Sequence, residues 1–183
     1  LKHRPFWVME QQSAITGWET VGRTPKPGQL GLWAMQSIAH GADTIVFFRW
    51  RSCVMGTEQY WHGILPHNGR PGRYYRELKA FMQEAGPLLE RLQGSVPHPE
   101  VAMLFSYDQY DALSIQPHHP HLQYPEHLLT YYSGFYRQKI PVEFVREEDD
   151  WSSYRVLVAP LQFLMTEKLS EKFHAYVQQG GVL

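Results

Sequence analysis

The chain has 183 residues, of which 43% are hydrophobic and 14% aromatic, enough to build one or two globular domains with buried cores. Its 17 basic and 18 acidic residues give a net charge of −1, so we expect no nucleic-acid or membrane partner. No apolar run approaches the roughly 20 residues that span a bilayer. A single cysteine, Cys53, rules out an internal disulfide and favours a reducing compartment, which predicts a cytoplasmic location.

Both ends of the chain run into predicted secondary structure. The first residues enter an apolar strand at once, and residues 179–183 pass a pair of glycines into the start of another strand. We therefore expect the chain to be an internal segment of a longer protein.

The first half of the chain predicts a strand, a helix and a second strand. Residues 6–10 are apolar up to a final Glu, and residues 44–50 are β-branched and aromatic without polar alternation until their end. Such a run predicts a strand that is covered on both faces. Between the strands, a helix begins near Pro27, carries an apolar stripe and ends before Gly41. The right-handed crossover of such a unit predicts that the two strands are parallel.

A longer helix follows over residues 73–92, and we expect Pro87 to kink or divide it. Residues 94–99 then combine a helix-stopping glycine with two prolines, which predicts a domain boundary. The chain is thereby divided into residues 1–96 and residues 97–183.

The second half alternates predicted strands with helices. The predicted elements are a strand over residues 100–105, a helix over 125–139, strands over 142–145 and 156–160, and a helix over 167–179 with Thr166 as its N-cap. This order indicates the opening of a doubly wound α/β domain.

Polar and aromatic side chains follow both strands of the first half. The first loop carries Glu10, Gln11, Gln12, Trp18 and Glu19, and the second carries Arg49, Trp50, Arg51, Glu58, Tyr60, Trp61 and His62. Because the carboxyl ends of parallel strands meet at one edge, these side chains are expected to converge. Aromatic faces that stack on sugar rings, beside carboxylates that accept hydroxyl hydrogens, indicate a sugar site. The alternative is that the tryptophans are ordinary core and Glu58 an exposed loop charge.

Other candidate chemistries have weaker support. Cys53 lacks the glycines of a nucleophile elbow, so we interpret it as packing. The second half contains no cysteine and therefore no amidotransferase nucleophile. The histidines His118, His119, His121 and His127 alternate with prolines, which fits a loop better than a metal site.

Several linked motifs resemble those of glycoside hydrolase family 42 β-galactosidases. The motifs are Val8-Met9-Glu10-Gln11, Trp18, the Arg-Thr-Pro-Lys-Pro-Gly of residues 23–28, His40-Gly41-Ala42-Asp43, Phe48-Arg49-Trp50-Arg51, and Gly56-Thr57-Glu58 through to His62-Gly63. The resemblance implies an α/β chain with two incomplete parts. Residues 1–96 resemble the last β/α units of a TIM (β/α)8 barrel, and residues 97–183 resemble the start of a flavodoxin-like, doubly wound trimerisation domain.

The resemblance also implies a function. It implies a retaining β-galactosidase that hydrolyses terminal β-D-galactosides, such as lactose or galacto-oligosaccharides, through a covalent galactosyl-enzyme intermediate. In this role Glu10 is the nucleophile, and Trp18, Glu58 and His62 line the galactose-binding subsite. The resemblance implies a homotrimer, and neither a cofactor nor a metal is expected.

Two features depart from the family pattern. The family acid/base is a Glu directly after an Asn on an earlier barrel strand, whereas the only Asn here, Asn68, is followed by Gly69. The acid/base is therefore expected outside this chain, and the segment alone should be inactive. The interval from Glu58 to His62 is also longer than the family spacing. Two alternatives stay open: a segment that serves only assembly, or a related retaining glycosidase for another β-glycoside or an α-L-arabinopyranoside.

Overall fold

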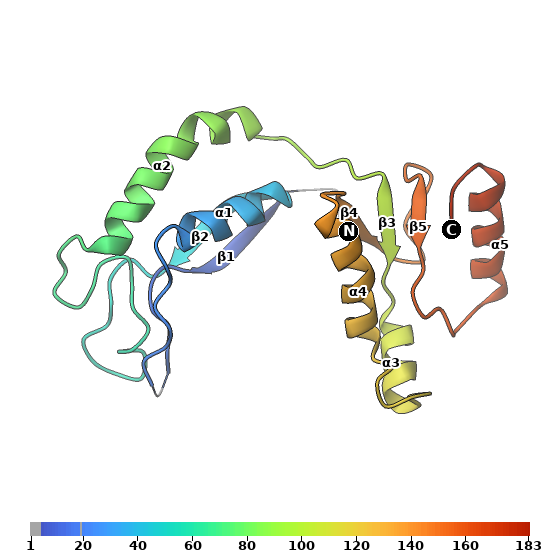
Figure 1. The fold of residues 1–183 in the computed structure, drawn as a ribbon, viewed down its shortest axis with the longest axis horizontal. Helices are drawn as coiled ribbons and strands as arrows, with labels where there is room; N and C mark the ends of the chain where they lie inside the picture. Colours follow the sequence, from blue (N-terminus) through green and yellow to red (C-terminus); the bar gives the residue numbers. More distant parts are fainter. Residues whose placement is uncertain (1–4, 19) are drawn as a thin grey trace. The chain divides into compact units, whose positions relative to one another are not determined.

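The computed structural model describes residues 5–18 and 20–183 of the chain. Contacts between residues separate two compact units, one ending at Pro97 and the other beginning at His98. Both units are built from parallel strands and helices (Figure 1). The chain is therefore of the α/β class, as its sequence predicts.

The first unit contains the predicted strand, helix and strand. Strands β1 (Phe6–Gln12) and β2 (Ala42–Phe48) pair in parallel, and helix α1 (Gln29–Ala39) connects them and packs against both. The parallel arrangement is confirmed. The helix begins two residues later than predicted, because Gly28 adopts a left-handed φ of 82°; it ends where Gly41 has a φ of 94°, as the sequence indicates.

One face of this small sheet is left open by the described residues. Helix α1 buries Leu30 and Ala34, but on the strands Trp7 is 59% exposed and Val46 is 38% exposed. The prediction that the second strand is covered on both faces is therefore wrong for this chain. A two-stranded sheet with a helix on one side leaves its other face uncovered.

Helix α2 (Arg73–Leu92) has the predicted bounds and buries Leu78 and Ala85. Pro87 lies inside the helix without dividing it. Proline removes the hydrogen bond to the carbonyl four residues earlier and its ring crowds that carbonyl, so of the two expected effects a kink stays a prediction.

The second unit is a three-stranded parallel sheet with helices. Its elements are β3 (Val101–Leu104), α3 (Tyr107–Ile115), α4 (Tyr124–Arg137), β4 (Val142–Val145), β5 (Val156–Val158) and α5 (Glu167–Gln178). The strand order is β4-β3-β5, and all four residues of the central strand are buried. Val182 forms a further parallel bridge with Val156, so the apolar run at the end of the chain extends the sheet beyond β5.

Helices cover both faces of the second sheet. Ala102 and Leu104 of β3 pack in one cluster with Phe173 of α5, whereas Met103 packs in another with Leu128 of α4. This alternation follows from the two-residue period of a strand. The predicted N-cap of α5 is confirmed, because the Thr166 hydroxyl accepts a hydrogen bond from the Leu169 N–H at 3.2 Å.

Helix α3 was not predicted from the sequence. Its apolar residues follow no helical period, so the pattern gives little signal, although Ser106 caps it by accepting a hydrogen bond from the Gln109 N–H. The Gln109 side chain is 1% exposed. It donates to the Leu164 carbonyl and accepts from the N–H groups of Phe163 and Leu164, at 2.8 to 2.9 Å, so it fixes the loop before α5.

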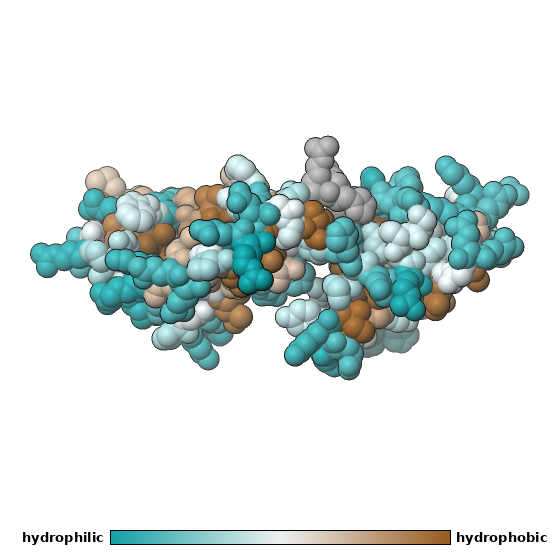
Figure 2. Space-filling view, turned by 90° about the horizontal axis from the view of Figure 1, so that it is seen from above, coloured by the Kyte–Doolittle hydropathy of each residue, from teal (hydrophilic) through white to brown (hydrophobic). Residues whose placement is uncertain are grey.

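Apolar side chains also reach the surface of both units, as the brown atoms among the teal ones in Figure 2 show. Met55 of the first unit is 77% exposed, and Ile115 of the second is 84% exposed. Large exposed apolar side chains indicate surfaces that other parts of a protein can cover.

Candidate active site

The loops that follow β1 and β2 are fastened to one another. Gln12 and Phe48, the last residues of the two strands, are partners in the parallel ladder. The next residue, Ser13, is fully buried, and its hydroxyl donates to the Phe48 carbonyl at 2.7 Å and lies 3.3 Å from that of Arg49. Ser13 was not singled out from the sequence, because a bond across 36 residues leaves no local pattern.

The second loop folds back onto the end of β2. The Ile64 N–H donates to the Arg49 carbonyl and the Leu65 N–H to the Trp50 carbonyl, both at 2.8 Å. A third bond, from the His62 N–H to the Ile15 carbonyl at 2.8 Å, joins this loop to the first. The predicted convergence of the two loops is therefore present.

Gly63 lies where this fold-back is tightest. A β-carbon at this position would lie 2.7 Å from the Arg49 carbonyl oxygen and 2.8 Å from backbone atoms of Arg51, closer than packed atoms tolerate. We expect Gly63→Ala to destabilise the complete protein by about 1–3 kcal/mol. The midpoint of urea denaturation measures this effect.

The matched control for that substitution is Gly86→Ala in α2. A β-carbon at Gly86 meets nothing within 4 Å, and alanine in a helix interior is favoured over glycine by about 0.5–1 kcal/mol. The two substitutions should therefore shift the urea midpoint in opposite directions. A Gly63→Ala protein as stable as the parent would contradict the described loop packing.

Glu10 lies near the carboxyl end of β1, which extends two residues beyond the predicted end. Two residues of β1, Met9 and Glu10, stand opposite a single residue of β2, Val46, so the strand contains a bulge at this position. Bulges bend a strand and redirect its side chains, and they are frequent beside active sites. The Glu10 side chain is exposed. Among the described residues, no hydrogen bond or ion pair joins it to Trp18, Glu58 or His62.

Glu58 is joined to Arg49, whose side chain the sequence placed in the second loop without a role. One terminal nitrogen of the Arg49 guanidinium pairs with the Glu58 carboxylate, and the other contacts the Cys53 sulfur. The guanidinium carbon lies 4.5 Å from the centre of the Phe48 ring. The peptide bond between Phe48 and Arg49 is cis.

Aromatic rings gather beside this ion pair. The Trp18 and Trp61 rings meet edge to face with centroids 5.0 Å apart, and Trp61 lies 6.2 Å from Phe48. Trp18 is 59% exposed, so much of its surface is open to a ligand. The alternative that both second-loop tryptophans are core does not hold for Trp50, which is 60% exposed; Trp61 is half-buried. Glu19, in the same loop as Trp18, lies outside the described residues.

The His62 ring lies beside another histidine. Its ring lies 4.8 Å from that of His67, and burial, followed by the charge of His67, lowers the pKa of His62 from 6.5. The structure thus brings together four of the predicted residues, Trp18, Trp61, Arg49 and Glu58. The described contacts of His62 are instead with His67 and with the first loop.

The lowered pKa of His62 predicts a pH dependence of stability. Below pH 6.5 the unfolded chain takes up a proton that the folded chain resists, so the contribution of neutral His62 is present above this pH and is lost as the pH falls below it. We expect a His62→Gln protein to lose less stability than the parent between about pH 7 and pH 5. Urea midpoints across this range measure the difference, and equal slopes would contradict it.

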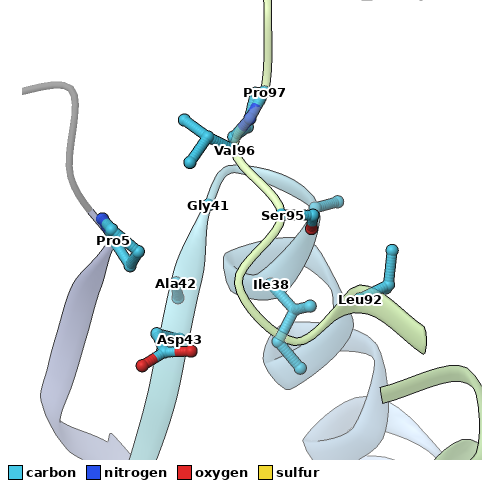
Figure 3. A pocket seen from close by; sticks show the side chains of 10 residues that line it. Pro5, Ile38, Gly41, Ala42, Asp43, Leu92, Ser95, Val96 and Pro97 are labelled. Carbon is cyan, nitrogen blue, oxygen red and sulfur yellow. The ribbon is translucent and has the colours of Figure 1, made fainter. Parts of the chain in front are cut away.

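Two other features of the described chain do not add to the site. A cavity of about 230 Å³ lies at the opposite, amino ends of the strands, between Asp43, Val96 and Pro97 (Figure 3). Asn68 accepts a hydrogen bond from the Arg70 N–H, as in a turn.

Across residues 5–18 and 20–183, no group of three or more possible metal ligands occurs. Within the same residues, none of the helices has the length and apolar character of a membrane span.

Carboxylates and aromatic rings at the carboxyl ends of parallel strands are suited to bind a sugar. Residues 1–87 match the family described as Beta-galactosidase, and residues 99–183 match the Beta-galactosidase trimerisation domain. The chain is 34% identical to β-galactosidase BgaA of Clostridium cellulovorans, covering 100% of this chain and 28% of that protein.

Solved structures of β-galactosidases are also similar to this chain. The β-galactosidase of the Antarctic haloarchaeon Halorubrum lacusprofundi is 37% identical with a TM-score of 0.86, covering 97% of this chain and 26% of that one. A GH42 β-galactosidase from G. stearothermophilus is 30% identical with a TM-score of 0.89, covering 98% and 27%. The chain belongs to glycoside hydrolase family 42, the β-galactosidases, and spans between 26% and 28% of the length of these relatives.

Proposed function

We propose that this chain is part of a retaining β-galactosidase and carries its nucleophile. Residues 1–96 supply the last β/α units of a TIM barrel, and residues 97–183 supply the start of a flavodoxin-like trimerisation domain. The strand order β4-β3-β5 supports the second assignment, because flavodoxin-like sheets also place their first strand between the second and the third.

The observation that carries the proposal is the position of Glu10. It is an exposed carboxylate at a bulge near the carboxyl end of a parallel strand, in a chain whose relatives are named β-galactosidases. Barrel enzymes hold their catalytic groups at this end of the strands, where loops form the pocket and the packed strand below limits movement.

In this role Glu10 takes part in a double displacement. Its carboxylate attacks the anomeric carbon of a terminal β-galactoside as the glycosidic bond breaks, and the leaving oxygen takes a proton from a second carboxylic acid about 5 Å away. That acid belongs to the barrel outside this chain. Water then cleaves the galactosyl ester with the acid acting as base, and the two inversions together retain the configuration.

The loops around Arg49 form the galactose subsite. The exposed Trp18 ring offers a flat apolar face to the pyranose, Glu58 accepts hydrogen bonds from its hydroxyl groups, and His62 completes the lining. The match of residues 99–183 to a trimerisation domain supports a homotrimer, which sedimentation of the complete protein tests. The cytoplasmic location predicted from the single cysteine stays a prediction.

A 2-deoxy-2-fluoro-galactoside with a good leaving group tests the nucleophile. The fluorine slows hydrolysis of the galactosyl ester, so the adduct accumulates and peptide mass mapping locates it. We expect the label on Glu10; a label on another residue would exclude this role. A panel of nitrophenyl glycosides separates a β-galactosidase from an enzyme for another β-glycoside or an α-L-arabinopyranoside. A trimer without turnover on any of them would favour a role in assembly alone.

A further inference from the structure

The backbone of Arg49 is held from both loops of the candidate site. Its carbonyl oxygen accepts the Ile64 N–H at 2.8 Å and lies 3.3 Å from the hydroxyl of the buried Ser13. Because Gly63 has no β-carbon, the second loop can approach this carbonyl. These contacts fix the position of the Arg49 backbone at the end of β2.

The Arg49 side chain is fixed as well. It lies over the Phe48 ring, contacts the Cys53 sulfur and pairs with the Glu58 carboxylate. The Arg49 side chain is 17% exposed, and that of Glu58 is 37% exposed. The guanidinium is thus largely enclosed, and the carboxylate that it holds stays open on one side.

We propose that Arg49 is a positioning residue that orients Glu58 for the sugar, an inference that rests on the proposed function. Glu58 sits in a loop of turns without helix or strand, where a free carboxylate would sample many orientations. Fixing it in advance removes an entropy cost that the sugar would otherwise have to offset on binding. In this inference Arg49 acts through Glu58 and takes no part in the reaction itself.

The guanidinium is suited to this role in a way that lysine is not. It presents planar nitrogens in fixed directions, one toward Glu58 and one toward Cys53, while its flat face lies on Phe48. A lysine ammonium is a point charge on a flexible stem and cannot meet all three neighbours. Charge alone should therefore restore only part of the function.

The test uses the complete enzyme and the variants Arg49→Met, Arg49→Lys, Glu58→Gln and the double variant Arg49→Met with Glu58→Gln. Arg70→Met is the matched control: this arginine is exposed and lies in the loop before α2, where its backbone N–H donates to the Asn68 side chain. The measurements are kcat and KM on an aryl β-galactoside and the inhibition constant of galactose. Thermal unfolding selects variants that keep the parent fold.

We expect Arg49→Met to raise the galactose inhibition constant by about 10- to 100-fold, since Glu58 loses its charged partner. Arg49→Lys should recover part of this loss, and Arg70→Met should change the inhibition constant by less than about twofold. Because Arg49 acts through Glu58, the double variant should bind galactose no more weakly than Glu58→Gln alone. A parent-like inhibition constant for Arg49→Met, or additive losses in the double variant, would overturn the inference.

These outcomes are separate from those of the proposed function. If the parent enzyme turns over a different glycoside, the same cycle is measured with that sugar, and it still decides whether Arg49 acts through Glu58. If Arg49→Met does not fold, Arg49→Lys carries the test, and equal inhibition constants for Arg49→Lys and the parent would contradict a requirement for guanidinium geometry. A galactosyl label on a residue other than Glu10 would exclude Glu10 as the nucleophile. The measured coupling between Arg49 and Glu58 would still stand.

Discussion

Glu10→Gln removes the proposed nucleophile and is expected to lower kcat of the complete protein on an aryl β-galactoside by about 10⁴-fold or more. Glutamine keeps the shape of the side chain but cannot form the galactosyl ester. The proposed galactose subsite, around Trp18 and Glu58, is unchanged in this variant. The inhibition constant of galactose should therefore move far less than kcat, and steady-state kinetics measure both.

A control substitution and a rescue sharpen this result. Glu84→Gln removes an exposed carboxylate from α2 and should leave kcat within about twofold. Azide should restore turnover to Glu10→Gly by attacking the anomeric carbon from the vacated side, which gives a galactosyl azide of inverted configuration. Near-parental turnover of Glu10→Gln, or an azide product of retained configuration, would exclude Glu10 as the nucleophile.

The largest effect on stability is expected from Trp151→Ala in the second unit. Trp151 is 2% exposed, stacks on Phe173 with centroids 5.3 Å apart and donates its indole N–H to the Arg146 carbonyl at 3.0 Å. The Lys172 ammonium lies 3.9 Å from the centre of its ring. Removing the ring leaves a cavity and takes away one of two hydrogen bonds to the Arg146 carbonyl, which still accepts the Asp149 N–H at 3.2 Å. We expect a cost of about 3–5 kcal/mol.

Amide hydrogen exchange of β3 and β5 in the complete protein measures this loss locally, which suits a protein whose domains need not unfold together. Trp151→Phe should lose less, because a ring is retained and only the hydrogen bond and part of the volume are removed. Ile115→Ala is the control, since Ile115 is 84% exposed. Unchanged exchange of β3 in Trp151→Ala would show that this cluster does not hold the sheet.

The secondary structure was most predictable where local pattern and caps agree. Residues 142–145 and 73–92 have the observed bounds, and the cap at Thr166 is present. Helix α3 was missed because its apolar residues lack a helical period. It is held by distant partners: Gln109 bonds a loop more than 50 residues away, and Leu113 packs in the cluster of Met103. Propensity and period describe only neighbours along the chain.

The covering of β2 was also mispredicted, for a different reason. Its apolar run correctly predicts a strand. The described chain covers only one face of the small sheet, however, and Val46 is 38% exposed. A sequence states which residues favour burial, whereas the partners that bury them are set by the whole fold.

For the candidate site, the sequence alone determined the residue types and where they occur: a carboxylate at the end of one strand, and aromatic and charged residues after the next. It also determined family 42 membership through motifs in a fixed order. Only the tertiary structure decided which of these residues meet. The Ser13 hydroxyl reaches the end of β2, Arg49 holds Glu58, and His62 lies beside His67. Such contacts depend on how the loops fold back on the strand ends. Because they join residues that are distant in the sequence, they produce no periodic pattern along the chain.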